Sequence, residues 1–503
     1  MRFPHLARPR LLVSLVTALA SLAAGGLMDG CAGSATVPPS QVYAPTPYYP
    51  TPAPQPLPQP APLPAPLPQP GPIPAPAPVS HANIQLGIDV LAAQNFSVLQ
   101  GKRVGLLTHP AGVNAAGVST IDVLRHAPGV KLVALYAAEH GIYGTIGAGA
   151  SMPKKQMDSK TGLPIYTVYF TVDGDKKGDF RKASPDMLGD IDVMVIDLQD
   201  VGTRSYTFIS CLLCTMEACF EQNKTVVVLD RPNPLGGLKV GGPIIEDKWM
   251  SYVGALKIPY VHGLTIGEVA YLAKDNLSLL PISPQVSDPV RKLFQVSPEV
   301  WNHGKLIVVP MSGWHRSMLW ADTGLPWIPT SPNIPTAEAA FGYSLTGLAG
   351  VMGNFKHGVD TPYPFRLLNY SPHIPPDQLA ATLNALKLGG LSFMPLAYGE
   401  KNEKSGVYVA ITNWNAVEPT RLAFELMKLD AAWTWTKSGN PYARAAGDKL
   451  LVHDFNIYGG SDAWWREITT KGRLANVDGF FKLWDAQDAA YQQMTRKWWL
   501  YQP

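Results

Sequence analysis

The feature that most limits what this chain can fold into is a proline-rich segment near its N-terminus. Between Pro38 and Ser80, 19 of 43 residues are proline, and none of the 43 carries a charge. Proline fixes φ and lacks a backbone N–H, so alternating prolines exclude helices and sheets and favour an extended polyproline II chain. At ~3.1 Å per residue, such a segment reaches on the order of 130 Å. We therefore expect residues 31–83 to form a linker and the folded part to begin near residue 84.

The residues before the linker have the pattern of an export signal. Three arginines precede an apolar run from Leu11 to Leu27. At about 17 residues, this run is short for a membrane span, and no basic stop-transfer cluster follows it. We therefore expect residues 1–30 to be a signal peptide. Cys31 lies in a sequence similar to a bacterial lipobox, which predicts a lipidated periplasmic or outer-membrane-anchored protein. The alternative is a soluble periplasmic protein released by ordinary signal cleavage.

The composition argues against several classes of function. The chain has 41 basic and 38 acidic residues, a formal net charge of +3. This near-balance argues against nucleic acid or an anionic membrane surface as the main partner. Four cysteines exclude a disulfide scaffold, and no Cys/His spacing is typical of a zinc finger. Cys211, Cys214 and Cys219 share one predicted helix, where we expect small buried apolar side chains. Nothing in the sequence indicates a metal or an organic cofactor.

From Ile84 onward, short apolar runs alternate with helix-length segments. The predicted strands are Arg103–Thr108, Lys131–Tyr136, Pro164–Tyr169, Ile191–Asp197 and Thr225–Asp230, and the predicted helices include Ser119–His126 and Tyr206–Gln222. Such alternation is typical of βαβ units and of a parallel sheet with helices on both faces. We therefore expect a Rossmann-like α/β domain over residues 84–290. Neither G-x-G-x-x-G nor G-x-x-x-x-G-K-[ST] is present, so nucleotide binding is not supported.

Beyond about Leu280 the alternation loosens, and the loops become long and rich in Pro, Gly and Trp. The predicted strands are Lys305–Pro310 and Gly406–Thr412, and the predicted helices are Pro376–Leu388, Pro419–Leu429 and Trp484–Trp498. We expect a smaller α+β auxiliary domain over residues 291–503, closing a cleft against the first domain.

Polar residues follow four of the predicted strands of the first domain. The segments are Thr108-His109, Glu139-His140, Asp197 to Arg204, and Asp230 to Asn233. Because ligands bind at the carboxyl ends of parallel strands, these side chains are expected to share one polar cleft. Ordinary structural roles compete with this interpretation: Asp230 could cap a helix, and Arg204 could pair with Asp200. No G-x-S-x-G or H-E-x-x-H pattern occurs, whereas paired carboxylates are what glycoside cleavage uses.

At these loops the sequence resembles the exo-β-N-acetylmuramidases of the NamZ (YbbC-like) family, formerly a domain of unknown function. The motifs that carry the resemblance are Thr108-His109-Pro110, Glu139-His140-Gly141, Asp158 with Thr161-Gly162-Leu163-Pro164, Gln199-Asp200-Val201-Gly202-Thr203-Arg204, Met216-Glu217-Ala218, Asp230-Arg231-Pro232-Asn233-Pro234, His262-Gly263-Leu264-Thr265 with Glu268, and Ser331-Pro332-Asn333. The resemblance covers roughly Leu86 to Tyr501. It implies release of N-acetylmuramic acid (MurNAc) from the non-reducing end of peptidoglycan fragments, and a cleft between a Rossmann-like and an auxiliary domain. Gly241-Gly242-Pro243 departs from the family's Glu-Gly-Pro, near the expected substrate rim.

The residues and the resemblance agree on Glu139 as the catalytic acid, because burial at the sheet edge would favour a protonated carboxyl group. Its expected catalytic partners are Glu217 and His140, with Asp200 and Asp230 as competitors and the substrate's own acetamido group as a further alternative. Arg204 is suited to a substrate carboxylate through a bidentate fork. The remaining expected substrate-binding residues are His109, Asp200, Tyr206, Asp230, Arg231, Asn233, His262 and Asn333.

Two other functions remain open from the sequence alone. A wall lipoprotein could hold a muropeptide in the same cleft without cutting it. An amidase or esterase could use Glu139 and His140 without a nucleophilic serine.

Overall fold

The computed structural model describes residues 83–150, 152–172, 178–282, 294, 297–350, 353–371, 374–399, 401, 403–434 and 441–503. The expected signal peptide, the lipidation site Cys31 and nearly all of the proline-rich linker lie outside the described residues. In the part of the chain that is described, no helix is long and apolar enough to cross a membrane.

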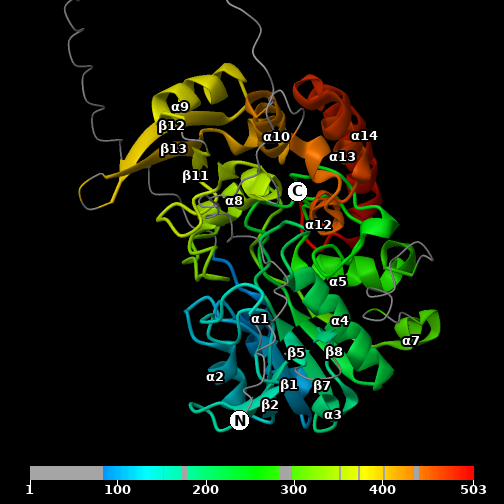
Figure 1. Ribbon diagram of the computed structural model, residues 1–503. Coiled ribbons are helices and arrows are strands. Elements are labelled where there is room, and N and C mark those ends of the chain that lie inside the picture. Colours follow the sequence, from blue (N-terminus) through cyan, green and yellow to red (C-terminus); the bar gives the residue numbers. More distant parts are fainter. Residues whose placement is uncertain are drawn as a thin grey trace, which may run out of the picture. The chain divides into compact units, whose positions relative to one another are not determined.

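The first part of the described chain is built around a seven-stranded sheet (Figure 1). In sheet order, its strands are β3 (Lys155–Met157), β4 (Pro164–Thr167), β2 (Lys131–Ala137), β1 (Arg103–Thr108), β7 (Val193–Asp197), β8 (Thr225–Leu229) and β9 (Leu306–Val309). Every neighbouring pair is parallel except β3 and β4. The chain adds strands outward from β1 on both sides, so the direction of winding reverses between β1 and β7. The expected Rossmann-like parallel sheet is confirmed.

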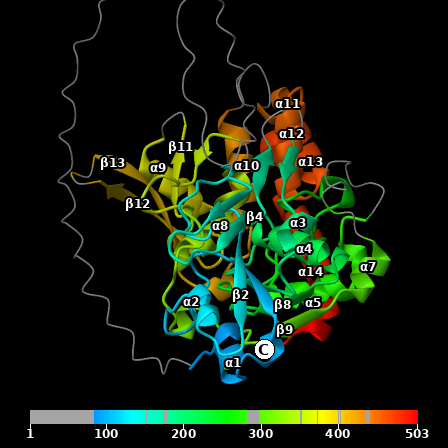
Figure 2. The ribbon, with the colours of Figure 1, turned by 90° about the horizontal axis from the view of Figure 1, so that it is seen from below.

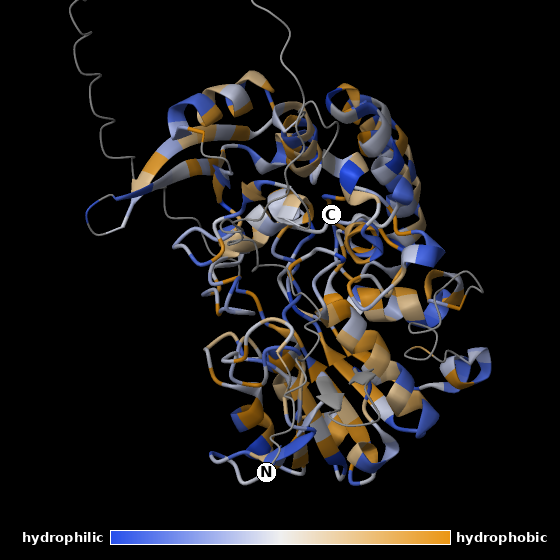
Figure 3. Ribbon diagram, in the orientation of Figure 1, coloured by the Kyte–Doolittle hydropathy of each residue, from blue (hydrophilic) through white to orange (hydrophobic). Residues whose placement is uncertain are grey.

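Helices cover both faces of this sheet (Figures 1 and 2). They are α1 (Gly87–Ala93) and α2 (Thr120–Arg125) on one face, and α4 (Phe208–Glu221), α5 (Ile266–Asp275) and α7 (Pro298–His303) on the other. Successive strand residues therefore enter different cores: Val195 packs in the core with α1 and α2, and Ile196 in the core with α4 and α5. The central strands are hydrophobic on both sides for this reason (Figure 3). A short α3 (Pro185–Leu188) and a hairpin of β5 (Phe170–Val172) and β6 (Gly178–Phe180) precede β7.

Helix α4 is buried almost along its whole length. All residues from Phe208 to Phe220 are buried, including the three cysteines, whose exposed fractions are 0–1%. A helix that is apolar all round belongs inside a core. The expectation that Cys211, Cys214 and Cys219 are small buried side chains is confirmed.

The second part contains a smaller antiparallel sheet and most of the remaining helices. The sheet runs β10 (Phe355–Lys356), β11 (Leu367–Tyr370), β13 (Lys404–Ile411) and β12 (Leu391–Tyr398). The helices are α8 (Ala337–Thr346), α9 (Pro376–Ala385), α10 (Arg421–Trp433), α11 (Pro441–Ala445), α12 (Lys449–Gly459), α13 (Asp462–Lys471) and α14 (Val477–Thr495). Helix α9 packs on β12 and β13, and the core is rich in aromatic rings such as Phe424, Trp464 and Trp484. This agrees with the expected smaller α+β part.

Two features extend the first part beyond residue 290, where the sequence placed the boundary. Strand β9 pairs with β8 in the large sheet. The C-terminal end of the chain also returns to this part, since Tyr501 packs in the core with α1 and donates a hydrogen bond to Asp230. Periodicity could not reveal either contact, because both join segments that lie far apart in the chain.

Candidate active site

The site lies where the winding of the large sheet reverses, at the carboxyl ends of β1 and β7. His109 follows β1, and Gln199 follows β7. The backbone N–H of Gln199 donates to His109 Nε2 at 2.8 Å, so the ring proton is on Nδ1. Burial lowers the pKa of His109 well below its ordinary value, which keeps the ring neutral. Among the described residues, Nδ1 has no hydrogen-bond partner, which leaves a buried donor at the topological switch point where α/β proteins bind ligands.

Glu139 lies just beyond the end of β2 and is held at the start of α4. Its exposed fraction is 7%. One carboxylate oxygen accepts a hydrogen bond from Thr207 Oγ1 at 2.6 Å, and the other accepts from the backbone N–H of Gly149 at 2.8 Å. Thr207 immediately precedes α4, so the carboxyl group faces the positive end of a 14-residue helix. Two donors on different segments thus fix the orientation of this carboxyl group.

His140 shapes the loop that carries Glu139. Its backbone φ is 74°, a left-handed conformation that is uncommon outside glycine. Its Nδ1 lies 2.9 Å from the carbonyl oxygen of Ile146, which closes the loop on itself. Strain of this kind collects at functional sites. His140 therefore has a visible structural role next to the expected acid.

Asp200 carries the second carboxyl group at this edge of the sheet, and only one of its two oxygens accepts hydrogen bonds within the described residues. Oδ2 accepts hydrogen bonds from the backbone N–H of Gly202 at 2.7 Å and from His262 Nε2 at 3.2 Å. His262 Nδ1 accepts from the backbone N–H of Leu264, which places the ring proton on Nε2 and makes His262 the donor to Asp200. The other oxygen, Oδ1, is buried and has no partner within the described residues. The arrangement leaves one oriented lone pair available.

Two buried tyrosines, Tyr206 and Tyr343, interact electrostatically with Glu139 and Asp200. Burial raises the pKa of Tyr206 above its ordinary value, and Glu139 and Asp200 raise it further. Tyr343 on α8 is affected in the same direction by burial and by both carboxyl groups. Asp200 and Thr207 lie on the same loop between β7 and α4, and Thr207 donates a hydrogen bond to Glu139, so this loop joins the two carboxyl groups in one cluster. Burial also raises the pKa of Tyr458 on α12, and Glu139 contributes in the same direction.

Hydroxyl groups complete the cluster. Ser205 Oγ lies 2.9 Å from the Tyr260 hydroxyl and 2.8 Å from the Tyr343 hydroxyl. Tyr206 donates to Thr330 Oγ1 at 2.9 Å. Thr330 begins the segment that contains the expected sugar-binding Asn333, which is partly exposed. The sequence did not single out Ser205, Thr207, Tyr343 or Tyr458. Ser205 and Thr207 could have been found as neighbours of the Arg204 motif, but α8 and α12 carried no signal.

The structure does not bring Glu217 to Glu139. Glu217 lies ten residues after Thr207 on the α4 axis, which corresponds to about 15 Å at ~1.5 Å per residue. Paired glycosidase carboxyl groups lie only ~5–9.5 Å apart. Glu217 is instead buried in an ion pair with Lys182, with Nζ to Oε2 at 2.9 Å. Burial raises the pKa of Glu217 to about 7, opposed by Lys182. The pairing of Glu139 and Glu217 expected from the sequence is not formed.

Arg204 also has a different environment from the expected one. Its guanidinium group is 99% buried and donates to the carbonyl oxygens of Pro243 at 2.9 Å, Ile258 at 3.2 Å and Tyr458 at 2.9 Å. Burial lowers its pKa to about 10. Both terminal nitrogens donate to carbonyl oxygens of the chain itself, whereas the buried Nε has no hydrogen-bond partner among the described residues. Nor does Arg204 pair with Asp200. The side chain instead joins the loop after β7 to α12.

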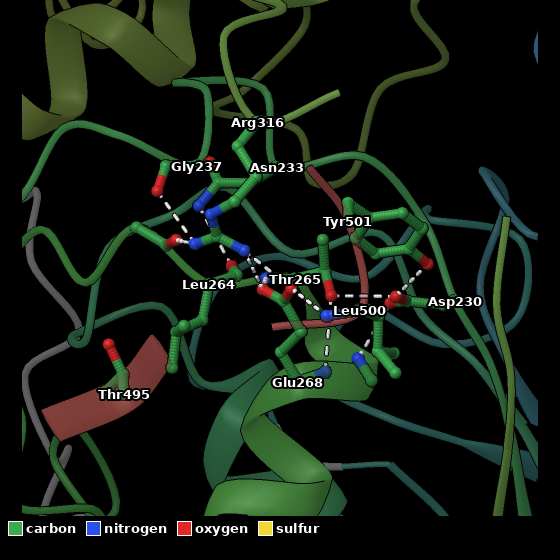
Figure 4. Close-up of polar contacts among 12 residues, drawn as sticks. Asp230, Asn233, Gly237, Leu264, Thr265, Glu268, Arg316, Thr495, Leu500 and Tyr501 are labelled. Atoms are coloured by element: carbon green, nitrogen blue, oxygen red, sulfur yellow. Dashed lines mark hydrogen bonds and ion pairs between the residues drawn. The ribbon is translucent and has the colours of Figure 1, made fainter. Parts of the chain in front are cut away.

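Three more expected binding residues are held in internal networks, drawn in part in Figure 4. Asp230 accepts hydrogen bonds from Thr265 Oγ1 at 2.7 Å and the Tyr501 hydroxyl at 2.5 Å, and two backbone N–H groups donate to it as well. Burial raises the pKa of Asp230 to about 6. Arg231 pairs with the buried Asp197 at 2.5 Å and 2.9 Å.

Asn233 uses both ends of its amide within the chain, donating to the Leu264 carbonyl oxygen and accepting from the Leu235 N–H. Asp230, Arg231 and Asn233 therefore fix the loop after β8 rather than offering free groups to a ligand.

The cluster has the components of acid–base chemistry on a polar substrate. It holds two oriented carboxyl groups, a neutral histidine with a free donor, and several hydroxyl groups. Within the described residues, no group of three or more His, Cys, Asp or Glu side chains is placed to hold a metal ion.

The chain is similar to proteins of one known family. The family model described as exo-β-N-acetylmuramidase NamZ, N-terminal, matches residues 104–338, and the corresponding C-terminal model matches residues 341–501. The peptidoglycan β-N-acetylmuramidase NamZ of Bacillus subtilis strain 168 is 37% identical over 352 residues, 69% of this chain and 77% of the relative.

Two crystal structures of DUF1343 family proteins from Bacteroides fragilis are also similar. One is 37% identical with a TM-score of 0.67 and covers 83% of this chain and 99% of its own. The other is 23% identical with a TM-score of 0.58, and the match covers 84% of this chain and 99% of that chain. It shares the fold. Together, the two matching halves and the curated relative show that the chain belongs to the exo-β-N-acetylmuramidase NamZ family.

Proposed function

We propose that this protein is a glycoside hydrolase that releases MurNAc from the non-reducing end of peptidoglycan fragments. The observation that carries the proposal is the cluster at the carboxyl edge of the sheet, where Thr207 and Gly149 orient the carboxyl group of Glu139 and where Asp200 Oδ1 is buried without a hydrogen-bond partner among the described residues. Membership of the NamZ family and the activity in the name of the Bacillus relative support the substrate class.

In this proposal Glu139 protonates the leaving oxygen. Its carboxyl group is oriented by Thr207 and Gly149, so it needs little reorganisation in the transition state. Asp200, rather than Glu217, is proposed as the second carboxyl group of the reaction. Its Oδ1, which has no partner among the described residues, is proposed to act as base, as nucleophile, or as the group that orients the substrate's acetamido nitrogen. His262 holds its other oxygen.

His109 is proposed to bind the sugar through its free Nδ1–H. Because the ring is neutral and fixed by Gln199, it can donate one hydrogen bond without adding charge. Tyr206 and Tyr343 are proposed to contribute hydroxyl groups to the same sugar-binding site.

The test is release of MurNAc from a MurNAc–GlcNAc disaccharide and from a chromogenic β-MurNAc glycoside. Activity in the wild-type protein, lost in Glu139→Gln and in Asp200→Asn, supports the proposal. A folded protein that binds the disaccharide by calorimetry without releasing product would refute it.

We further propose that the protein is exported and carries a lipid on Cys31. The basic and apolar pattern of residues 1–30 and the lipobox-like sequence support this location. The linker of residues 31–83 would then hold the enzyme at a distance from its membrane anchor.

A further inference from the structure

A cavity lined by none of the residues of the Glu139 and Asp200 cluster lies beside α14. It has a volume of about 490 Å³ and is bordered by the loop of residues 235–240, residues 316–319, the short helix η6 (Trp414–Ala416) and helix α14. None of its lining residues belongs to the proposed active site. The volume is in the range of ~300–1,000 Å³ that small ligands occupy. We refer to this cavity as the α14 groove.

An acidic residue that lines this groove has one carboxyl oxygen without a hydrogen-bond partner. Asp488 on α14 is 94% buried, and its Oδ1 has no hydrogen-bond partner among the described residues. Asp485, three residues earlier on the same helix, also lines the groove and is exposed. Burial and the neighbouring Asp485 raise the pKa of Asp488 to about 8, opposed by the Gly242 amide. Burying a carboxyl group without a partner is costly, so its retention here calls for a ligand that complements it.

The basic residues of the groove are already engaged elsewhere. Lys239 Nζ donates to the carbonyl oxygens of Asn415 at 2.9 Å and Val417 at 3.0 Å. Arg316 forms a buried ion pair with Glu268 at 2.5 Å and donates to two carbonyl oxygens (Figure 4). Neither side chain is hydrogen-bonded to Asp485 or Asp488 in the described part of the chain. Asp485 and Asp488 therefore have no ion-pair partner among the described residues, although Lys239 and Arg316 line the same groove.

Apolar side chains form one part of the wall, beside the polar Ser317, Asn415 and Gln492. Leu238 is 42% exposed at the rim, and Val240, Leu319 and Ala489 continue the surface. An aliphatic stem would remove this surface from water. Two carboxyl groups alone do not make a metal site, whereas an ammonium group on a methylene chain matches both the acidic and the apolar walls.

We propose that the α14 groove is a binding site for a primary ammonium group on an aliphatic stem, as in a lysine residue of a peptide. Asp488 and Asp485 receive the ammonium group, and Leu238, Val240 and Leu319 contact the stem. This binding is separate from glycoside cleavage and does not depend on the proposed active site.

Calorimetry on the full chain tests the proposal with two capped amino acids. Nα-acetyl-lysine methylamide is expected to bind saturably, and Nα-acetyl-norleucine methylamide, which has a similar stem but no ammonium group, is expected to bind at least tenfold more weakly. Asp488→Asn should weaken lysine binding at least tenfold, and Asp485→Asn about threefold. The matched control is Asp478→Asn, since Asp478 lies on the same helix outside the groove and pairs with Arg421.

The pH profile adds an independent readout. A carboxylate binds an ammonium group better than a protonated acid does, so affinity should rise between pH 6.5 and 9 as Asp488 loses its proton. The charged groups around it are Asp485 on its own helix and Lys239 and Arg316 across the groove. Equal binding of the two ligands, no binding of the lysine ligand, or the same loss in Asp478→Asn as in Asp488→Asn would overturn the proposal. If Asp488→Asn does not fold, the Asp485→Asn variant provides the test, because Asp485 is exposed. An affinity of this variant for the lysine ligand equal to that of the wild-type protein would refute the proposed site.

Discussion

Replacing Glu139 by glutamine separates acid catalysis from structure because the local contacts can survive the change. In the native protein, the carboxylate accepts from Gly149 N–H and from Thr207 Oγ1. In Glu139→Gln, the amide oxygen can still accept from Gly149, and the amide nitrogen can donate to Thr207, because a hydroxyl group both donates and accepts. Both contacts are retained, and the free energy of unfolding should change by less than about 1 kcal/mol.

The catalytic effect should be much larger. Glutamine cannot supply a proton, and general acid catalysis contributes ~10²–10⁴-fold. We therefore expect kcat on a MurNAc–GlcNAc disaccharide to fall by that factor, about 3–5 kcal/mol in activation free energy, with KM little changed. The loss should be smaller for a nitrophenyl glycoside, because its leaving group needs little protonation. The assay follows release of GlcNAc and of nitrophenolate at several pH values.

Two results would refute this reasoning. Near-wild-type kcat of Glu139→Gln on the disaccharide would place the acid elsewhere. An equal loss on both leaving groups would make Glu139 a nucleophile or a positioning residue instead. Glu217→Gln is the matched control, since it also neutralises a buried carboxyl group but lies far along α4.

Four further predictions concern other residues. Asp200→Asn should lower kcat by about 10²–10⁴-fold with the fold intact, since the amide oxygen can still accept from Gly202 and His262; wild-type turnover would exclude Asp200 from the chemistry. Glu217→Gln should keep kcat/KM within about threefold. Because the folded pKa of Glu217 is raised to about 7, wild-type stability should fall as pH rises from about 4.5 to 7, by at most about 3 kcal/mol, and the variant should lose this slope in urea unfolding. Arg204→Met should lower the free energy of unfolding by about 3 kcal/mol or more, because three buried carbonyl oxygens lose their donor; an unchanged thermal midpoint would contradict this. Cys31→Ala should move the protein from the membrane fraction to the soluble periplasm, and an unchanged distribution would exclude lipidation there.

Local patterns in the sequence were enough to predict the parallel sheet and the edge that carries the site. Strands such as Arg103–Thr108 are buried on both faces, so they stand out as continuous apolar runs. The placement of Glu139 and Asp200 followed because all parallel strands end at the same edge. The extended proline-rich linker is also a prediction from the sequence alone, because proline restricts the backbone regardless of its surroundings.

Contacts between distant segments decided the rest. From the sequence, Arg204 is suited to binding a substrate carboxylate. In the structure it donates to the carbonyl oxygen of Tyr458, 254 residues further along the chain. Glu217 is a plausible partner for Glu139 in the sequence, but in the structure it lies about 15 Å along α4 from Thr207, the residue that holds Glu139, and it pairs with Lys182. Tyr343 and Tyr458 join the site from helices that carry no local signal. A sequence motif names which polar groups are present, but only tertiary packing fixes whether each has its hydrogen bonds satisfied internally or keeps a free atom for a ligand. That distinction separates Asp200, with a free Oδ1, from Asp230, which the fold fully engages.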